Sequence, residues 1–189
     1  MQDNILERAN DGDLRAMNDL ICQHQDMIYN TIYYMVGNHV DAEDLTQTVF
    51  LKALKNLKSF RHQSQFSTWL YAIALNTVKN YRRSSAKRQH MSIHNSGDCC
   101  EENRPVEFES ATPQPWESLI TFENQSMLKE AISTLKPDHK EIIVLRDIQE
   151  LSYNHIAEVL DISLGTVKSR LARARKTLKN QLKIKMGVV

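Results

Sequence analysis

Glycine and proline are scarce in this chain, which has five glycines and four prolines among its 189 residues. Both residue types interrupt regular elements, whereas the remaining stretches are rich in Leu, Ile, Lys, Glu and Gln, which favour helices over strands. We therefore predict an all-α fold. A chain of this length can form one medium domain or two small ones, and two small helical domains fit the pattern of the sequence better.

Long apolar runs are also missing. No run approaches the roughly 20 residues that are needed to span a bilayer, and the first residues, Met1 to Asn4, are polar and lack a signal-peptide core. We therefore expect a cytoplasmic protein. Cysteine is equally rare, since only Cys22, Cys99 and Cys100 occur, and this odd count argues against a disulfide framework.

Acidic residues are absent from two segments, although the formal net charge of the whole chain is only +1. Residues 79–90 carry five Lys and Arg side chains and no acid, and residues 163–189 carry eight and no acid. Residues 95–125, which lie between them, hold seven acids against one arginine. Two basic modules therefore flank an acidic segment.

The spacing of apolar residues divides the chain into two helical domains. Residues 91–119 lose the helical pattern, contain prolines and are acidic, so we predict an extended linker there between domains at 1–90 and 120–189. The second domain has four short helices in this interpretation. The first has helices over about 3–10, from its cap Asp13 to Gly37, from its cap Asp41 to about 58, and from its cap Ser67 to about 88.

Residues 152–185 have the spacing of a helix-turn-helix. Ser152 can cap a helix over 153–160, a three-residue turn follows, and Ser163 can cap a second helix that ends near 184. One side of the second helix is apolar, and the opposite side carries Lys and Arg, with Arg173 and Lys168 as the best candidates for contacts with base edges in the major groove. The alternative is an ordinary amphipathic helix with a solvated basic face.

The helix after Ser67 has a second unusual face. Trp69, Ile73, Asn76, Asn80 and Arg83 share one side of it, and an aromatic ring with two amides and an arginine suits stacking and hydrogen bonding to unpaired bases. The neighbouring segment from Phe60 to Phe66 adds aromatic and polar side chains that a flipped base needs. The alternative is that Trp69 and Ile73 belong to the core and that the asparagines are merely solvated.

Four strings resemble a known family. Residues 41–50 (DAEDLTQTVF) and 66–76 (FSTWLYAIALN) resemble conserved region 2 of bacterial sigma factors. Residues 151–157 (LSYNHIA) and 165–175 (GTVKSRLARAR) resemble region 4. With two domains, a short linker and no room for other sigma regions, the chain is similar to the extracytoplasmic-function group.

The resemblance implies a transcription initiation factor that acts with core RNA polymerase, through its beta and beta-prime subunits, on promoter DNA. It also implies an anti-sigma partner and association with the nucleoid through polymerase. It implies no cofactor and no insertion into a membrane. The residues that it implies for contact with core polymerase are Asp44, Gln47, Phe50 and Leu51.

Two DNA-binding sets follow from the same resemblance. The downstream, minus ten element would be melted and bound by Phe60, Arg61, His62, Gln63, Trp69, Asn76, Lys79, Asn80 and Arg83. The upstream, minus thirty-five element would be bound by Ser163, Thr166, Lys168, Ser169, Arg173 and Lys176. Thr48 departs from the acidic residue that is usual in the family, and Ala172 is smaller than its counterpart in many relatives.

Three other hypotheses compete with this one. Zinc could bind His90, His94, Cys99 and Cys100, but adjacent cysteines do not match the usual Cys-x₂₋₄-Cys spacing, and we predict no metal site. An enzyme is disfavoured because the sequence has no phosphate-binding glycine loop, nucleophile elbow or His-Glu-x-x-His motif. The serious alternative is a stand-alone helix-turn-helix regulator that binds a palindrome as a dimer without polymerase.

Overall fold

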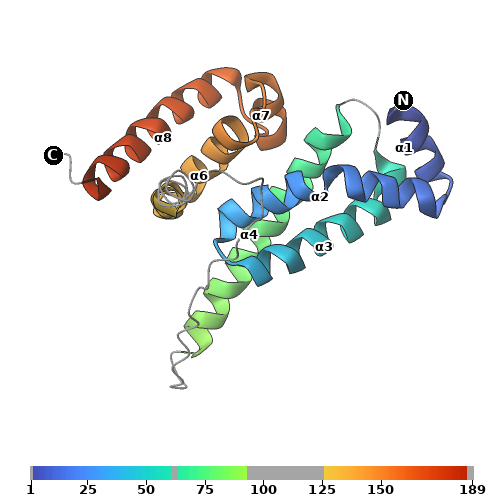
Figure 1. The fold of residues 1–189 in the computed structure, drawn as a ribbon, viewed down its shortest axis with the longest axis horizontal. Helices are drawn as coiled ribbons and strands as arrows, with labels where there is room; N and C mark the ends of the chain where they lie inside the picture. The colour runs from blue at the N-terminus through green and yellow to red at the C-terminus, as the bar shows by residue number, and fades with distance from the viewer. Residues whose placement is uncertain (1, 61–63, 93–125, 187–189) are drawn as a thin grey trace, which may run out of the picture.

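The structure, a computed structural model, describes residues 2–60, 64–92 and 126–186, and every regular element in these ranges is a helix or a helical turn. Figure 1 shows α1 and α8 at opposite sides of the molecule, with α4 running between the N-terminal and C-terminal helices. The prediction of an all-α fold is confirmed for the part of the chain that is described.

The N-terminal module consists of α1 (Gln2–Asn10), α2 (Leu14–Val36), α3 (His39–Lys55), the short turn η1 (Leu57–Ser59) and α4 (Phe66–Ser92). Both predicted ends of α2 are confirmed. The Asp13 carboxylate accepts from the N–H groups of Arg15 and Ala16, and Gly37 adopts a left-handed conformation with φ 80° as the helix ends. That conformation suits glycine because it has no Cβ to clash with the carbonyl.

Two predicted caps in this module are wrong. Asn38, not Asp41, caps α3, because its side-chain oxygen accepts from the Asp41 N–H at 3.2 Å and the helix already begins at His39. The Asp41 carboxylate instead accepts from the Tyr81 hydroxyl at 2.7 Å and ties α3 to α4. Likewise α4 begins one residue before Ser67, since the Trp69 N–H bonds to the Gln65 carbonyl.

The C-terminal module consists of helical residues 126–133, α6 (Pro137–Ile143), the π-helical turn η2 (Val144–Ile148), α7 (Tyr153–Leu160) and α8 (Leu164–Lys185). Pro137 occupies the first turn of α6, where a missing N–H costs no helical hydrogen bond. The widened turn η2 was not predicted from the sequence.

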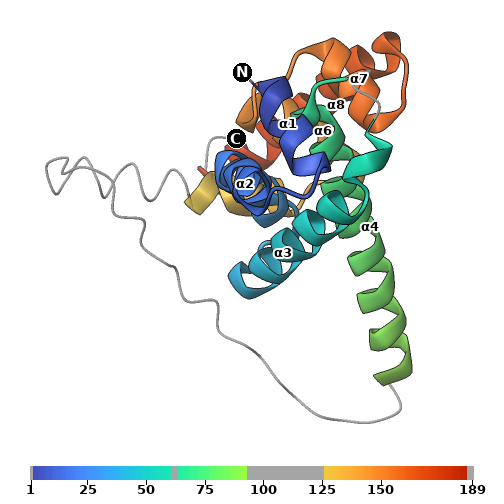
Figure 2. The same ribbon diagram turned by 90° about the vertical axis from the view of Figure 1, so that its right-hand side faces the viewer.

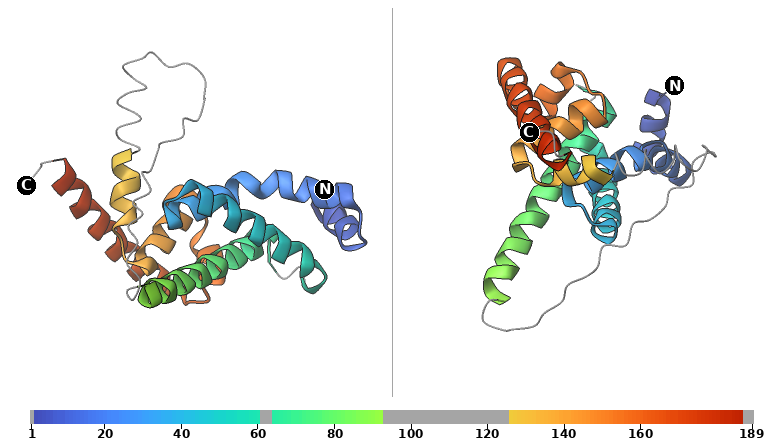
Figure 3. Two further views of the ribbon diagram at one scale, coloured as in Figure 1. Left: turned by 90° about the horizontal axis from the view of Figure 1, so that it is seen from below. Right: turned by 60° about the vertical axis from the view of Figure 1, so that its left-hand side comes forward.

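One continuous apolar core joins the two modules. Buried side chains of α2, α3 and α4, such as Ile32 and Val78, belong to the same cluster as Ile142 and Leu145 of the C-terminal module. Helix α4 contacts α7, and α2 contacts η2. Figures 2 and 3 show the second half of α4 projecting beyond the other helices, while its first half lies among them. Sequence reasoning predicted two linked domains but not their direct contact.

The predicted boundaries at 91–119 fall mostly within residues 93–125, which lie outside the described ranges, as do Arg61, His62 and Gln63. Among the helices that are described, none has the length and apolar character to cross a membrane.

Candidate nucleic-acid interface

Helices α7 and α8 form the predicted helix-turn-helix with the predicted bounds. The Ser152 hydroxyl accepts from the His155 N–H at 3.2 Å, and the Ser163 hydroxyl accepts from the Thr166 N–H at 3.2 Å, so both helices have a side-chain cap. Between them Asp161 adopts a left-handed conformation with φ 52°, which reverses the chain within three residues. This short connection fixes α8 against α7.

The two sides of α8 differ as the sequence predicted. Val167, Leu171 and Ala174 are buried in the core, which holds the helix in place. The opposite side presents exposed polar and basic side chains: Lys168, Ser169, Arg173, Lys176 and Lys183. No acid occurs along α8, so the positive potential of this face is not offset within its own helix.

The other arginines of α8 are held by acids of the same module. Arg175 forms a two-pronged ion pair with Asp147 of η2, which raises the pKa of the guanidinium. Arg170 lies 3.6 Å from Asp138 of α6. Arg173, by contrast, has no acidic partner among the described residues. Of these three arginines, Arg173 is therefore the one available to a ligand.

The hydroxyls at the start of α8 already have partners. Ser163 and Thr166 share a hydrogen bond of 2.9 Å, and the Ser169 hydroxyl donates to the Thr166 carbonyl at 3.1 Å. Each of these hydroxyls keeps further capacity as an acceptor. They can therefore hold the helix start rigid and still contact a phosphate or a base.

Helix α4 separates its polar and apolar sides as predicted. Leu70, Ala74 and Val78 are buried, whereas Asn76, Asn80 and Arg83 are exposed. Trp69 is half-buried at the N-terminal end of the polar side. Asn80 and Arg83 lie towards the projecting half of the helix, where a nucleic-acid strand can approach without meeting another element (Figure 2).

The aromatic residues before α4 form a cluster. The ring centroids of Phe60 and Trp69 lie 5.3 Å apart, and Phe66 lies 5.6 Å from each of them. Phe60 is only 8% exposed, so its ring packs against Trp69 and is not open to a base in this structure. Its role here is to support Trp69, which is a correction to the expectation that Phe60 itself faces DNA.

The face of α3 predicted to meet polymerase is largely exposed. Asp44, Gln47 and Leu51 lie on one side of the helix, and Leu51 is 69% exposed. Phe50, the fourth predicted contact, is 7% exposed and packs in the core, because it lies on the side of α3 that meets the rest of the module. An exposed leucine flanked by polar side chains is typical of a protein contact surface.

Lys79 has a partner that the sequence did not suggest. Its ammonium lies 3.3 Å from a carboxylate oxygen of Glu141 in α6. The side chain of Lys79 is 47% exposed and that of Glu141 only 5%. Burial raises the pKa of Glu141, and Lys79 and Arg82 partly oppose that shift. Contacts between distant segments leave no periodic pattern in a sequence, so this pair could not be found there.

No group of His, Cys, Asp and Glu side chains in the described ranges is arranged to hold a metal ion. The alternative zinc site, formed by His90, His94, Cys99 and Cys100, concerns only side chains that lie outside the described part of the chain.

Two family models match the chain. Sigma-70 region 2 matches residues 20–88, which run from α2 through α4, and sigma-70 region 4 matches residues 125–178, which include α6, α7 and most of α8. Each model covers one of the two modules.

Similar proteins support the same assignment along the whole chain. The ECF RNA polymerase sigma-E factor of Haemophilus influenzae is 34% identical over 179 residues, covering 94% of this chain and 93% of that protein. The ECF RNA polymerase sigma factor SigW of Bacillus subtilis is 31% identical over 179 residues, with 94% and 95% covered. The Escherichia coli sigma-E factor is 34% identical over 183 residues, with 94% and 92% covered.

Solved structures share the fold. The sigma factor RpoE of Bartonella quintana, crystallised with the anti-sigma factor NepR, has a TM-score of 0.69 at 23% identity and covers 90% of this chain and 99% of its own. CnrH, in complex with the cytosolic domain of CnrY, has a TM-score of 0.69 at 22% identity, with 95% and 96% covered.

Proposed function

Because the chain belongs to the family of ECF RNA polymerase sigma factors, we propose that it binds core RNA polymerase and directs it to start transcription at specific promoters. The observation that carries the proposal is the exposed, acid-free polar face of α8, held by a capped helix-turn-helix in a chain that also carries the region 2 helices. The family consists of regulatory transcription factors, and the proposal assigns no catalytic step to this chain.

Helix α8 contacts the minus thirty-five element in this proposal. Its N-terminal turns enter the major groove, where Lys168 and Arg173 face base edges and Lys176 faces a phosphate. Ser163, Thr166 and Ser169 contact the backbone at the helix start. The N-terminal end of the helix dipole favours the phosphate there.

Helix α4 binds the melted minus ten element. Unstacking a base costs a few kcal/mol, and stacking on an aromatic ring returns about 1–3 kcal/mol. Binding can therefore support melting only if polar contacts add to stacking. Asn76, on the exposed side of α4, provides such contacts together with Arg61, His62 and Gln63, while Lys79, Asn80 and Arg83 hold the strand.

Core polymerase binds the face of α3 formed by Asp44, Gln47 and Leu51. The apolar Leu51 supplies the buried centre of the contact and the two polar residues supply its rim. An anti-sigma factor is a further proposed partner, since the similar sigma factor RpoE was crystallised with one. We place the protein in the cytoplasm, at the nucleoid, through its association with polymerase.

Run-off transcription with purified core polymerase tests the proposal. The full-length chain is compared with Asn76→Ala and Arg173→Ala on candidate promoters. Matched controls are Asn30→Ala, an exposed asparagine of α2, and Lys183→Ala, which removes a charge from the same face of α8 ten residues further from its start. We expect promoter-specific transcripts from the wild type and both controls, reduced at least about tenfold by each test variant, as expected for losing a contact of 1–3 kcal/mol.

The alternative regulator predicts a different pattern. It would bind a palindromic operator as a dimer without polymerase and would give no transcript with core enzyme. That pair of results on every promoter tested would overturn the proposed function.

A further inference from the structure

The two modules are held together by polar contacts as well as by the shared apolar core. Besides the Lys79–Glu141 ion pair, the Tyr71 hydroxyl donates to the Gln149 side chain at 3.1 Å. The Lys129 ammonium also lies 4.8 Å from the centre of the Tyr33 ring. We call this set of contacts between α2 or α4 and the C-terminal module the seam.

This closed arrangement conflicts with binding both promoter elements at once. The two elements are named for positions 25 base pairs apart, which is roughly 85 Å at about 3.4 Å per base pair. In the closed arrangement α7, the helix that supports α8, contacts α4 itself. The modules must therefore separate before α4 and α8 can each reach their element.

The seam uses a side chain that the proposed function needs. Lys79 lies on α4 among the residues proposed to hold the DNA strand, and its ammonium faces the Glu141 carboxylate. A carboxylate and a phosphate oxygen are equivalent partners for an ammonium group, since both are anionic acceptors. Glu141 thus occupies the position that a DNA phosphate would take at Lys79.

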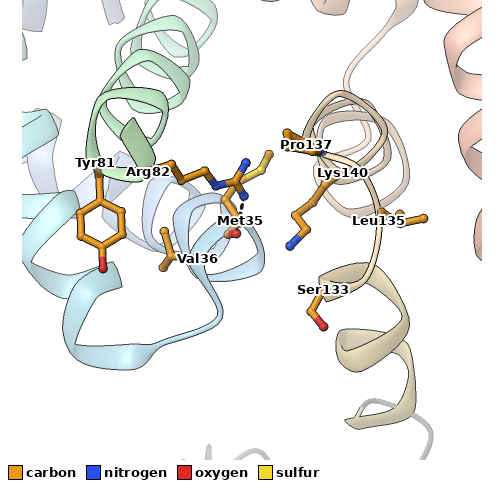
Figure 4. Close-up of a pocket in the computed structure, with 8 residues that line it drawn as sticks. All are labelled: Met35, Val36, Tyr81, Arg82, Ser133, Leu135, Pro137 and Lys140. Carbon is orange, nitrogen blue, oxygen red and sulfur yellow. Dashed lines mark hydrogen bonds between the residues drawn. The ribbon is translucent and has the colours of Figure 1, made fainter. Parts of the chain in front are cut away.

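The seam also contains a destabilising feature. A cavity of about 320 Å³ lies between the modules, with Arg82 and Met35 on one side and Lys140 and Leu135 on the other (Figure 4). The Arg82 guanidinium donates to the Met35 carbonyl at 2.6 Å. Lys140 is 8% exposed and has no acidic partner among the described residues, so its charge is buried beside another cation.

We infer that the closed arrangement is a self-inhibited state in which Glu141 competes with DNA for Lys79, and that the buried charge of Lys140 keeps this state only marginally stable. The inference rests on the proposed function. Two neighbouring residues of α6 act in opposite directions: Glu141 holds the modules together and Lys140 pushes them apart. A structural role alone would not give them opposite signs.

The test measures closure and DNA binding in the full-length protein without polymerase. Small-angle X-ray scattering gives the radius of gyration. Fluorescence anisotropy with a labelled oligothymidylate of about 12 nucleotides, within the site size of single-strand binders, gives the affinity. The variants are Glu141→Gln and Lys140→Met, and the controls on the same segment are Asp138→Asn and Lys136→Met, both at exposed positions.

We expect Glu141→Gln to expand the protein and to bind the oligonucleotide at least about threefold tighter, because a larger fraction of molecules has Lys79 free. Lys140→Met should leave the protein at least as compact as the wild type and weaken binding at least about threefold relative to Lys136→Met. Tyr71→Phe, which removes the bond to Gln149 without touching α6, should act in the same direction as Glu141→Gln.

Changes of the same sign in Glu141→Gln and Lys140→Met, or no difference from their controls, would overturn the inference. Run-off transcription with core polymerase separates this failure from failure of the proposed function. Glu141→Gln should support wild-type transcription, because polymerase holds the modules apart. An inactive wild type would instead count against the proposed function.

Discussion

Leu51 is the side chain that contributes most to the proposed polymerase contact. It is a large apolar residue on an exposed helical face, and water surrounds most of it in the free protein. Its neighbours Asp44 and Gln47 are exposed on the same side of α3. Burying such a side chain in an interface is favourable by about 1.5–3 kcal/mol.

We predict that Leu51→Ala weakens binding to core polymerase by at least about tenfold, since most of that burial is lost. Leu14→Ala is the matched control, because Leu14 is equally apolar and 78% exposed but lies at the start of α2. Binding is measured by titrating labelled protein with core enzyme. Equal effects of the two substitutions would show that the α3 face has no special part in the contact.

Asn38 tests the corrected cap of α3. Its side chain satisfies an N–H group that would otherwise lack a partner in the first turn. We predict that Asn38→Ala lowers the free energy of unfolding by about 0.5–2 kcal/mol. Denaturant unfolding followed by Trp69 fluorescence measures this, and Asn30→Ala, in the middle of an exposed face of α2, should change it little. A neutral Asn38→Ala would mean that the cap contributes nothing.

At the scale of single elements, α8 separates residues that bind from residues that support. Arg173 and Arg175 are two residues apart, yet only Arg175 is paired with an acid. Arg173 has no such partner within the described ranges and lies on the exposed face. The two arginines therefore have different expected roles.

We predict that Arg173→Ala weakens binding of the holoenzyme to promoter DNA by about 1–3 kcal/mol and relaxes base preference at one position. Arg175→Ala should instead lower thermal stability, because Asp147 loses its partner, with a smaller effect on DNA. Filter binding on a set of single-base promoter variants, together with thermal unfolding, separates these roles. Reversed effects would contradict the assigned orientation of α8.

Element by element, the sequence predicted what depends on local periodicity. The bounds and both caps of α7 and α8 follow from serine positions and helical spacing, and the exposed faces of α4 and α8 follow from the same spacing. Asp41 was mistaken for a cap because its carboxylate suits that position, but Asn38 lies three residues earlier and already supplies the bond. Phe50 and Phe60 were placed on contact surfaces, and tertiary packing buries both.

At the scale of the whole molecule, the contact between the modules is the feature that the sequence did not predict. Neither the Lys79–Glu141 pair nor the buried Lys140 can be recognised from residue spacing, since their partners lie in other segments of the chain. A sequence shows that Glu141 is charged but not that packing places it against α4. The regulatory inference therefore depends on the structure alone.

The charge of Lys140 makes closure depend on pH. Burial and the nearby Arg82 lower the pKa of Lys140 from 10.5 to about 8. Tyr81 lines the same cavity, and Glu141 follows Lys140 on α6. Between these two pKa values the closed form binds fewer protons than the open form, so raising the pH through this range favours closure.

We predict that the radius of gyration falls as the pH rises from about 7.5 to about 9.5 and that Lys140→Met abolishes this change. Glu141, whose pKa is raised in the closed form, acts in a lower range, where rising pH disfavours closure until the carboxyl is fully ionised. Scattering across the alkaline range measures the Lys140 effect. An identical pH response in Lys140→Met would assign it to other groups.

Permanganate footprinting tests the central claim most directly, because permanganate oxidises thymines that are unpaired. Core polymerase is mixed with promoter DNA and with the wild-type chain, with Asn76→Ala or with Asn30→Ala. We predict reactive thymines in the minus ten element with the wild type and with Asn30→Ala, few with Asn76→Ala, and none with core enzyme alone. A wild-type complex that binds the promoter and leaves every thymine of that element unreactive would contradict the claim.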